Sequence, residues 1–442
     1  MRINLTDNNF TQQNSNTFYR KDVSALFPIA NKTVAELCRE YENLLLFPFS
    51  IDKTDDRIGA SSVLSIQNTD DPEKVCIITE NIMGFIGVGD LQIKINSRFK
   101  SGQNDFLLHY MLQKVLSFNL FDLNHNSEQE DVFDFLMLMF PYFLKSAMRQ
   151  GIYREYQNHP HNDSNLKGTI DIGRHISKNV PFAGKIAYTT REYSHDNSVT
   201  ELIRHTVEFM RTKKYGQSVL NLDQETIENV IALVECTPSY NKCDRNNVIS
   251  KNLRLKKHPY YTEYYPLQML CLQILKMEEV KYGESDDEIC GILFDGAWLW
   301  EEYVNTLLKS RGFIHPENKL HKGGIYLFDD NTGIRYPDFY KDGFVLDAKY
   351  KRLGECKTIS QLDRNDVHQI MAYITTLRAS RGGFVFPLEQ KQTNIPTSRL
   401  NGNSALLSIY GIEISQTAKS YADFQIQMQH NEAAFIESLG NL

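Results

Sequence analysis

The chain of 442 residues is long enough for two or three domains with substantial hydrophobic cores. Hydrophobic residues make up 41% of it and charged residues 23%, which excludes a disordered chain and is typical of a soluble globular protein. The formal net charge of −7 excludes the strongly basic class of nucleic-acid-binding proteins, although local basic patches remain compatible with that function.

The sequence indicates a cytoplasmic protein that is not held in a membrane. Its first residues, Met1 to Asn9, are too polar for a signal peptide. The longest apolar run, Phe135 to Leu144, contains Pro141 and is too short to span a bilayer. The seven cysteines are scattered, odd in number and without a C-x-x-C pair, so we expect reduced thiols.

Residues 1–104 carry a mixed pattern that predicts an N-terminal α/β domain. A helix is expected over residues 33–42, and strands over 75–79 and 85–95 with a tight turn at Gly89-Asp90. The glycines near this turn do not indicate a phosphate-binding loop, because no Lys-Ser or Lys-Thr pair follows them and no helix opens after them. We therefore expect no nucleotide-hydrolysing site in this chain.

Helical periodicity dominates residues 105–288 and predicts a mainly helical middle domain. The expected helices are 106–118, 131–150 with a kink or break at Pro141, 199–213, 224–236 and 265–277. Segments 166–174 and 189–197 interrupt this pattern, and we interpret them as loops that order the helices. We also interpret residues 159–163, with two histidines, as a polar loop rather than a metal site, since further ligands are missing.

Residues 289–442 predict a third domain of mixed helices and strands. The expected elements are a helix over 294–309 ended by Gly312, strands near 324–328, 334–340 and 344–350, a helix over 360–378, and strands over 383–386, 406–410 and 412–415. The predicted fold class is thus α/β with a helical insert.

A hairpin in this third domain carries the strongest functional signal. Asp342-Gly343 between alternating apolar residues predicts a two-residue turn, which places Tyr340 opposite Val345 and Asp338 opposite Asp347. Side chains on a strand alternate with period two, so these four share one face. The same register places Tyr336 opposite Lys349 on that face.

Two carboxylates that face each other repel, so positive charge is expected between Asp338 and Asp347. Lys349 supplies one charge, and a divalent cation would supply the rest. Taken alone, the pattern also fits a solvated hairpin face. The apolar residues 344–346 lead straight into Asp347, however, so charge sits where burial is expected, which favours a functional site.

These residues resemble a known nuclease pattern. Pro337-Asp338 followed by Asp347-Ala348-Lys349 matches the PD-(D/E)xK motif, and Gln369 and Tyr373 match the Q-x3-Y arrangement of many of its members. Elsewhere, Arg98-Phe99 and segments 166–174 and 189–197 resemble McrC, the nuclease subunit of McrBC-type restriction systems. The resemblance implies a PD-(D/E)xK core of order αβββαβ in residues 289–442.

The resemblance also implies roles for individual side chains. The implied metal ligands are Asp338, Asp347, the carbonyl group of Ala348 and Glu301, and the implied catalytic residues are Asp338, Asp347, Lys349, Gln369 and Tyr373. The expected cofactor is Mg²⁺, for which Mn²⁺ can substitute, and Lys349 would orient or deprotonate the attacking water. Glu302 competes with Glu301, and either could be a solvent-facing helix charge.

By the same resemblance, the chain is expected to be a DNA endonuclease subunit in a GTP-dependent, modification-dependent (5-methylcytosine type) system. Its partner would be a McrB-like AAA+ GTPase hexamer, held by the N-terminal domain around residues 87–99. A non-catalytic adaptor is the first alternative, which the intact Asp338, Asp347 and Lys349 disfavour. A self-sufficient RecB- or Cas4-like exonuclease is the second; Cas4 types carry four cysteines for an iron–sulfur cluster, whereas this domain has two.

Overall fold

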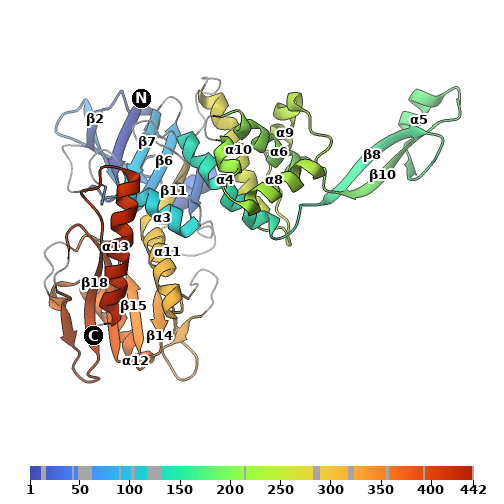
Figure 1. Cartoon of the computed structure of the whole chain (residues 1–442). Helices are drawn as coiled ribbons and strands as arrows, with labels where there is room; N and C mark the ends of the chain where they lie inside the picture. The colour runs from blue at the N-terminus through green and yellow to red at the C-terminus, as the bar shows by residue number, and fades with distance from the viewer. Residues whose placement is uncertain are drawn as a thin grey trace. The chain divides into compact units, whose positions relative to one another are not determined.

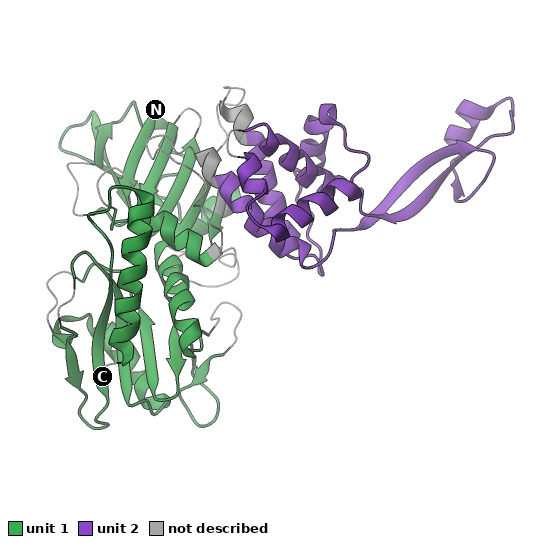
Figure 2. Ribbon diagram, viewed as in Figure 1, with its two compact units in different colours: residues 1–132, 283–442 green, residues 133–282 purple. Residues whose placement is uncertain are grey.

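The computed structural model describes most of the chain as a mixed α/β protein with several sheets. The residues that it does not describe are 11–15, 42–43, 48–61, 89–90, 101–104, 117–131, 214–215, 282–288, 317–322, 354–357, 392–393 and 441–442. The turn expected at Gly89-Asp90 lies outside the described residues. Two compact units are present, residues 1–132 with 283–442 and residues 133–282 (Figure 2). The finer domain boundaries at 104 and 288 stay predictions.

The first sheet of the larger unit joins strands from distant parts of the chain. Its order is β1 (Arg2–Thr6), β7 (Leu91–Asn96), β6 (Ile82–Val88), β11 (Ile289–Asp295) and β3 (Leu44–Phe47). β11 pairs antiparallel with β6 and parallel with β3, so it fills the gap between two N-terminal strands (Figure 1). Leu293 of β11 belongs to the same hydrophobic core as Ile86 and Ile93.

The position of β11 differs from the sequence prediction, which opens the C-terminal domain at residue 289 and starts a helix at residue 294. The helix α11 (Gly296–Leu308) begins two residues later, where the Asp295 carboxylate accepts a hydrogen bond from the amide of Ala297 at 2.9 Å. A short apolar run fits a buried strand as well as a helix, so periodicity alone does not assign it.

A second, three-stranded sheet of order β2 (Thr17–Tyr19), β5 (Lys74–Thr79) and β4 (Leu64–Asn68) also lies in this unit. The predicted N-terminal helix is confirmed as α1 (Val34–Glu40), with Thr33 and Glu36 forming a capping box. Residues 87–99, the expected GTPase contact, are largely buried where they are described. Gln92 and Lys94 are partly exposed, and the role of this segment as the GTPase contact stays a prediction.

The C-terminal sheet has the order β14 (Phe339–Lys341), β15 (Phe344–Ala348), β16 (Arg381–Leu388), β18 (Leu406–Glu413) and β17 (Thr397–Arg399). β15, β16 and β18 are parallel, and β14 and β17 are antiparallel strands at the two edges. The strand predicted over 334–340 is interrupted at Pro337, because β13 (Ile334–Arg335) pairs instead with β12 (Ile325–Tyr326). The strands predicted over 406–410 and 412–415 are one strand, β18.

Helices α3 (Phe106–Leu116), α11 and α13 (Tyr421–Gly440) meet in the same unit. Glu432 of α13 is their shared hydrogen-bond acceptor: one carboxylate oxygen accepts from the hydroxyls of Tyr110 and Tyr303, each at 2.8 Å, and the other from Lys114 at 2.9 Å. α3 was expected in the middle domain, and α13 was not predicted. The buried tyrosines of α3 and α11 explain why both helices stay together.

The smaller unit contains a bundle of helices, as predicted. They are α4 (Val132–Met148), α6 (Ser198–Arg211), α7 (Gly216–Leu220), α8 (Gln224–Cys236), α9 (Arg245–Asn252) and α10 (Tyr264–Lys281). α4 contains Pro141 and does not end there. Buried apolar residues line one face of α6, whose N-terminus is capped by Asn197.

The loops predicted for residues 159–163, 166–174 and 189–197 are wrong in this unit. β8 (Glu155–Asp163) and β10 (Ile186–Ser194) form an antiparallel ladder of nine residue pairs (Figure 1). The short strand β9 (Thr169–Ile170) also pairs with β10, and helix α5 (Ile172–Asn179) follows β9 in the chain. None of the β8 side chains is fully buried. The strand therefore has no hydrophobic alternation by which a sequence pattern could reveal it.

A buried ion pair connects the N-terminal sheet to the strand β15. Asp7 is fully buried and accepts hydrogen bonds from the amide and the guanidinium of Arg98, with 2.9 Å between Nε and Oδ2. The Arg98 guanidinium also lies over the ring of Tyr350, 4.8 Å from its centroid, and the Tyr350 hydroxyl bonds to Ser97 at 2.8 Å. Tyr350 directly follows Lys349, so the N-terminal residues fix the end of the D-x-K segment.

Among the described residues, no helix is both long and apolar enough to cross a membrane.

We predict that Arg98→Ala lowers the free energy of unfolding by about 3–5 kcal/mol, because it leaves the Asp7 carboxylate buried without its cation. Chemical denaturation of the full chain, followed by aromatic fluorescence, measures this change. Lys74→Ala, which removes a solvent-exposed ion pair with Asp71 at 3.1 Å, is the matched control and should shift the transition little. Equal shifts for both variants would contradict a structural role for the buried pair.

Candidate active site

The predicted hairpin is confirmed, with Tyr340 of β14 opposite Val345 of β15. Gly343 in the turn has a φ of +72°, a left-handed conformation that favours glycine. β15 lies between β14 and β16, so its residues 344–347 are buried. The strand thus carries its apolar residues and then Asp347 into the interior of the unit.

Asp347 is a carboxylate in an unfavourable place. Its exposed fraction is 1%, and its Oδ1 accepts no hydrogen bond from any described residue. Burial and the negative charge of Asp338 raise its pKa to about 8. The charge of Lys349, whose Nζ lies 2.6 Å from Oδ2, opposes this shift but does not cancel it.

Asp338 lies just before β14 and faces the end of β15. Its Oδ2 accepts a hydrogen bond from the amide of Ala348 at 2.7 Å. Burial and the charge of Glu301 raise its pKa to about 7. The structure therefore brings together the two carboxyl groups predicted to face each other, and the surroundings of both disfavour their charged form.

Lys349 is a permanent cation at this site. Burial favours its neutral form, but the charges of Asp347 and Asp338 outweigh burial and raise its pKa above the ordinary value. Its Nζ also lies 3.5 Å from Asp366 Oδ1 and 3.5 Å from Gln369 Oε1. An amine that stays protonated donates hydrogen bonds and balances charge, but does not accept a proton from water.

Gln369 and Tyr373 lie on one face of α12 (Arg364–Thr376), as their spacing predicts. Gln369 Nε2 donates to the Tyr373 hydroxyl at 2.9 Å, and this hydroxyl lies 3.5 Å from the carbonyl oxygen of Tyr336. Asp366 was not singled out in the sequence. Its position three residues before Gln369 on the same helix is the signal that could have found it.

Glu301 and Glu302 of α11 have different surroundings. Burial raises the pKa of Glu301 to about 7, and the charges of Glu302 and Asp347 add to the shift while His315 opposes it. Burial also opposes ionisation of Glu302, but a hydrogen bond with His315 lowers its pKa overall. Glu301 is thus the helix carboxylate that interacts electrostatically with Asp338 and Asp347. No sequence motif pointed to His315.

The donor set fits one divalent cation with an incomplete protein shell. The described residues contain no group of three or more His, Cys, Asp and Glu side chains that could hold a metal. Mg²⁺ is commonly bound through one or two carboxylates, with water and substrate phosphate as further ligands. Asp347, with an unpaired buried oxygen, and Asp338 supply two such carboxylates, so the residues fit this mode of binding.

Comparisons with known proteins agree with the sequence-based resemblance. A family profile described as "McrBC 5-methylcytosine restriction system component" matches residues 77–387, well over half of the chain. The chain belongs to this McrBC family. A comparison with curated proteins gives no significant match.

Solved structures include two matches to this McrBC family member. A chain in the refined half-complex from the tetradecameric assembly of Thermococcus gammatolerans McrB AAA+ hexamers with bound McrC has a TM-score of 0.50 and 16% identity, covering 97% of this chain and 100% of that one. At this identity the match shows a shared fold. A chain in the cryo-EM structure of the Thermococcus gammatolerans McrBC complex gives a TM-score of 0.34 and 14% identity, over 70% and 87% of the two chains.

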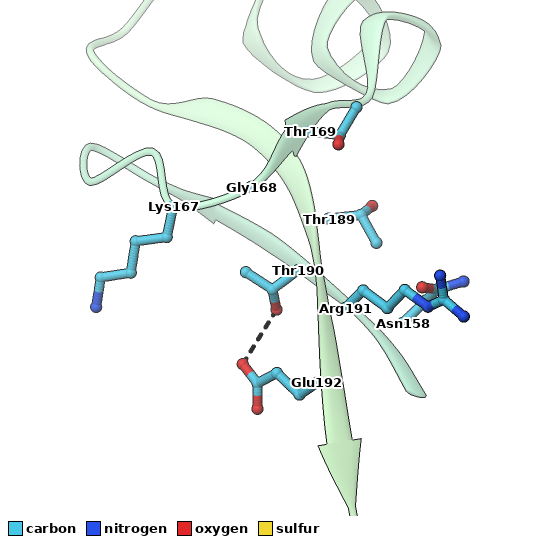
Figure 3. A pocket seen from close by; sticks show the side chains of 8 residues that line it. All are labelled: Asn158, Lys167, Gly168, Thr169, Thr189, Thr190, Arg191 and Glu192. Atoms are coloured by element: carbon cyan, nitrogen blue, oxygen red, sulfur yellow. Dashed lines mark hydrogen bonds between the residues drawn. The ribbon is translucent and has the colours of Figure 1, made fainter. Parts of the chain in front are cut away.

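The smaller unit of this McrBC family member has a groove of its own. It has a volume of about 620 Å³ and is lined by Asn158, Lys167, Gly168, Thr169, Thr189, Thr190, Arg191 and Glu192 (Figure 3). The Thr190 hydroxyl donates to Glu192 at 3.2 Å, and the Lys167 side chain extends away from the β-ladder. The groove holds no pair of buried carboxylates, so its chemistry differs from that of the hairpin site.

The raised pKa values predict how stability depends on pH. Folded Asp347 and Asp338 hold protons that the unfolded chain releases, so without divalent cations stability should fall as pH rises from about 4 to about 8. Mg²⁺ competes with these protons, so it should raise the melting temperature more at pH 8 than at pH 6. Asp347→Asn should reduce both effects. An equal Mg²⁺ response at both pH values in the unsubstituted chain would contradict this account.

Proposed function

We propose that this McrBC family member is a metal-dependent DNA endonuclease. The observation that carries the proposal is the buried Asp347 carboxylate, which faces Asp338 and Lys349 at the end of β15 and has an oxygen without a hydrogen-bond partner. A buried charge left unbalanced costs free energy. Binding of a cation in the reaction offsets that cost.

The residues present suit phosphodiester hydrolysis. Mg²⁺, or Mn²⁺ in its place, would neutralise charge on the phosphate and make water nucleophilic when held by Asp338, Asp347 and the Ala348 carbonyl group. Lys349 stays protonated, so it orients the attacking water and stabilises developing negative charge. Gln369 of α12 places its Oε1 3.5 Å from the ammonium group of Lys349, as a weak acceptor.

The two alternative functions have less support. A non-catalytic adaptor has no use for a buried carboxylate cluster, which only destabilises the fold. A Cas4-like exonuclease needs four cysteines for its cluster, and residues 289–442 contain only two. We therefore retain the endonuclease activity as the proposed function.

We also propose that the chain works with a McrB-like AAA+ GTPase hexamer. The family profile names a restriction-system component, and the chain of similar fold occurs in an assembly of McrB AAA+ hexamers with bound McrC. Residues 87–99 remain the predicted contact, with Gln92 and Lys94 partly exposed among the described residues of this segment.

We predict that Asp347→Asn, in the presence of the partner GTPase, lowers DNA cleavage at least about 100-fold, because it removes a metal-ligating charge. Cleavage of a methylated plasmid in Mg²⁺, resolved on a gel, measures the loss. Asp342→Asn is the matched control: it lies exposed in the turn of the same hairpin, where Asn-Gly is as suitable as Asp-Gly. Near-normal cutting by Asp347→Asn, or cutting in excess chelator, would refute the nuclease proposal.

We predict that the full chain alone binds and cuts DNA poorly and gains both activities with its cognate GTPase and GTP. Its net charge of −7 opposes the phosphate neutralisation that supplies most non-specific affinity for DNA. Cleavage assays at matched salt, with and without the GTPase and GTP, measure this dependence. Efficient cutting by the chain alone would favour a self-sufficient nuclease.

A further inference from the structure

The backbone at Asp338 is held by a side chain rather than by the sheet. The β14–β15 ladder begins at Phe339, so Asp338 precedes the strand pairing. Its carbonyl oxygen accepts a hydrogen bond from His315 Nδ1 at 2.7 Å. A carbonyl oxygen can only accept, so the Nδ1 of His315 carries the proton.

His315 is itself fixed in position. Its neighbour Ile314 makes two backbone hydrogen bonds with Tyr340, at 2.7 and 3.0 Å, and thereby extends the sheet by one bridge. The imidazole stacks on the Phe339 ring at a centroid distance of 5.0 Å, and 13% of the His315 side chain is exposed. The ring has little freedom to turn away from Asp338.

Both nitrogens of the imidazole also lie near carboxylates of α11. His315 Nε2 lies 3.5 Å from Glu302 Oε1, and Nδ1 lies 3.8 Å from Glu301 Oε1. These distances are longer than the 2.7 Å bond to Asp338. His315 thus touches the two elements that carry carboxylates of the site, and its closest polar contact is with Asp338.

We propose that His315 is a positioning residue that fixes Asp338 for divalent-cation binding, chiefly through the hydrogen bond to its carbonyl group; this inference rests on the proposed nuclease function. Mg²⁺ requires near-ideal ligand geometry, so a ligand whose backbone can drift binds it less well. Groups that orient metal ligands in this way typically contribute 10- to 100-fold to metal affinity. His315 does not itself need to touch the cation or the DNA.

Three substitutions separate the contacts of His315. An Asn side chain can place its amide N–H where Nδ1 lies, so His315→Asn keeps the bond to Asp338 and loses the glutamate contact. His315→Gln reaches further and keeps the contact with Glu302 while losing the bond to Asp338. His315→Ala loses both, and His430→Ala, at an exposed position on α13, is the matched control.

Binding of Mn²⁺ to the full chain is the direct measurement, by electron paramagnetic resonance at fixed pH and without DNA. We expect His315→Ala and His315→Gln to weaken Mn²⁺ binding about 10- to 100-fold. His315→Asn should stay within about threefold of the unsubstituted chain. Unchanged affinity in His315→Gln, or rescue by Gln but not by Asn, would overturn the proposed role. Should His315→Ala fail to fold, the Asn and Gln variants decide the question.

Asp347→Asn separates a failure of this inference from a failure of the nuclease proposal. Loss of Mn²⁺ binding in Asp347→Asn, with unchanged binding in all His315 variants, would overturn the positioning role and leave the nuclease proposal standing. Mn²⁺ binding and DNA cleavage that survive in Asp347→Asn would overturn both.

Discussion

The burial of Asp347 is the constraint on which the candidate site depends. A carboxylate at the inner end of an apolar strand is costly, and Lys349 balances only part of its charge. Burial, together with the negative charge of the neighbouring carboxylates, raises the pKa values of Asp347, Asp338 and Glu301. The fold therefore places unfavourable negative charge at one point, and this charge is what supports the proposed binding of a divalent cation there.

The same strand explains why the two ends of the chain form one unit. Asp7 and Arg98 come from the N-terminal sheet, yet their buried pair lies against Tyr350, the residue after Lys349. Phe99 packs edge-on against the same tyrosine ring, at 5.4 Å between centroids. The Arg-Phe pair that resembles McrC in the sequence thus packs against the residue that follows the D-x-K segment.

The sequence was sufficient for features that local rules determine. The Asp342-Gly343 turn set the register of its hairpin, and the periodicity of residues 224–236 matches α8. The sequence was not sufficient for features that depend on contacts with residues far away in the chain. β11 is a strand only because β6 and β3 flank it, β8 has no buried face, and His315 matters through a carbonyl group 23 residues away. A contact with a residue far away in the chain produces no pattern in the neighbouring sequence.

The place of β11 also has a consequence for synthesis on the ribosome. β6 emerges roughly 200 residues before β11, and the helical unit lies between them in the chain. At a translation rate of about 5–20 residues per second, β11, the strand that separates β6 from β3, is synthesised some 10–40 s after β6. During that interval the edges of β6 and β3 that pair with β11 lack their partner strand, so this sheet is completed only after the helical unit has been synthesised.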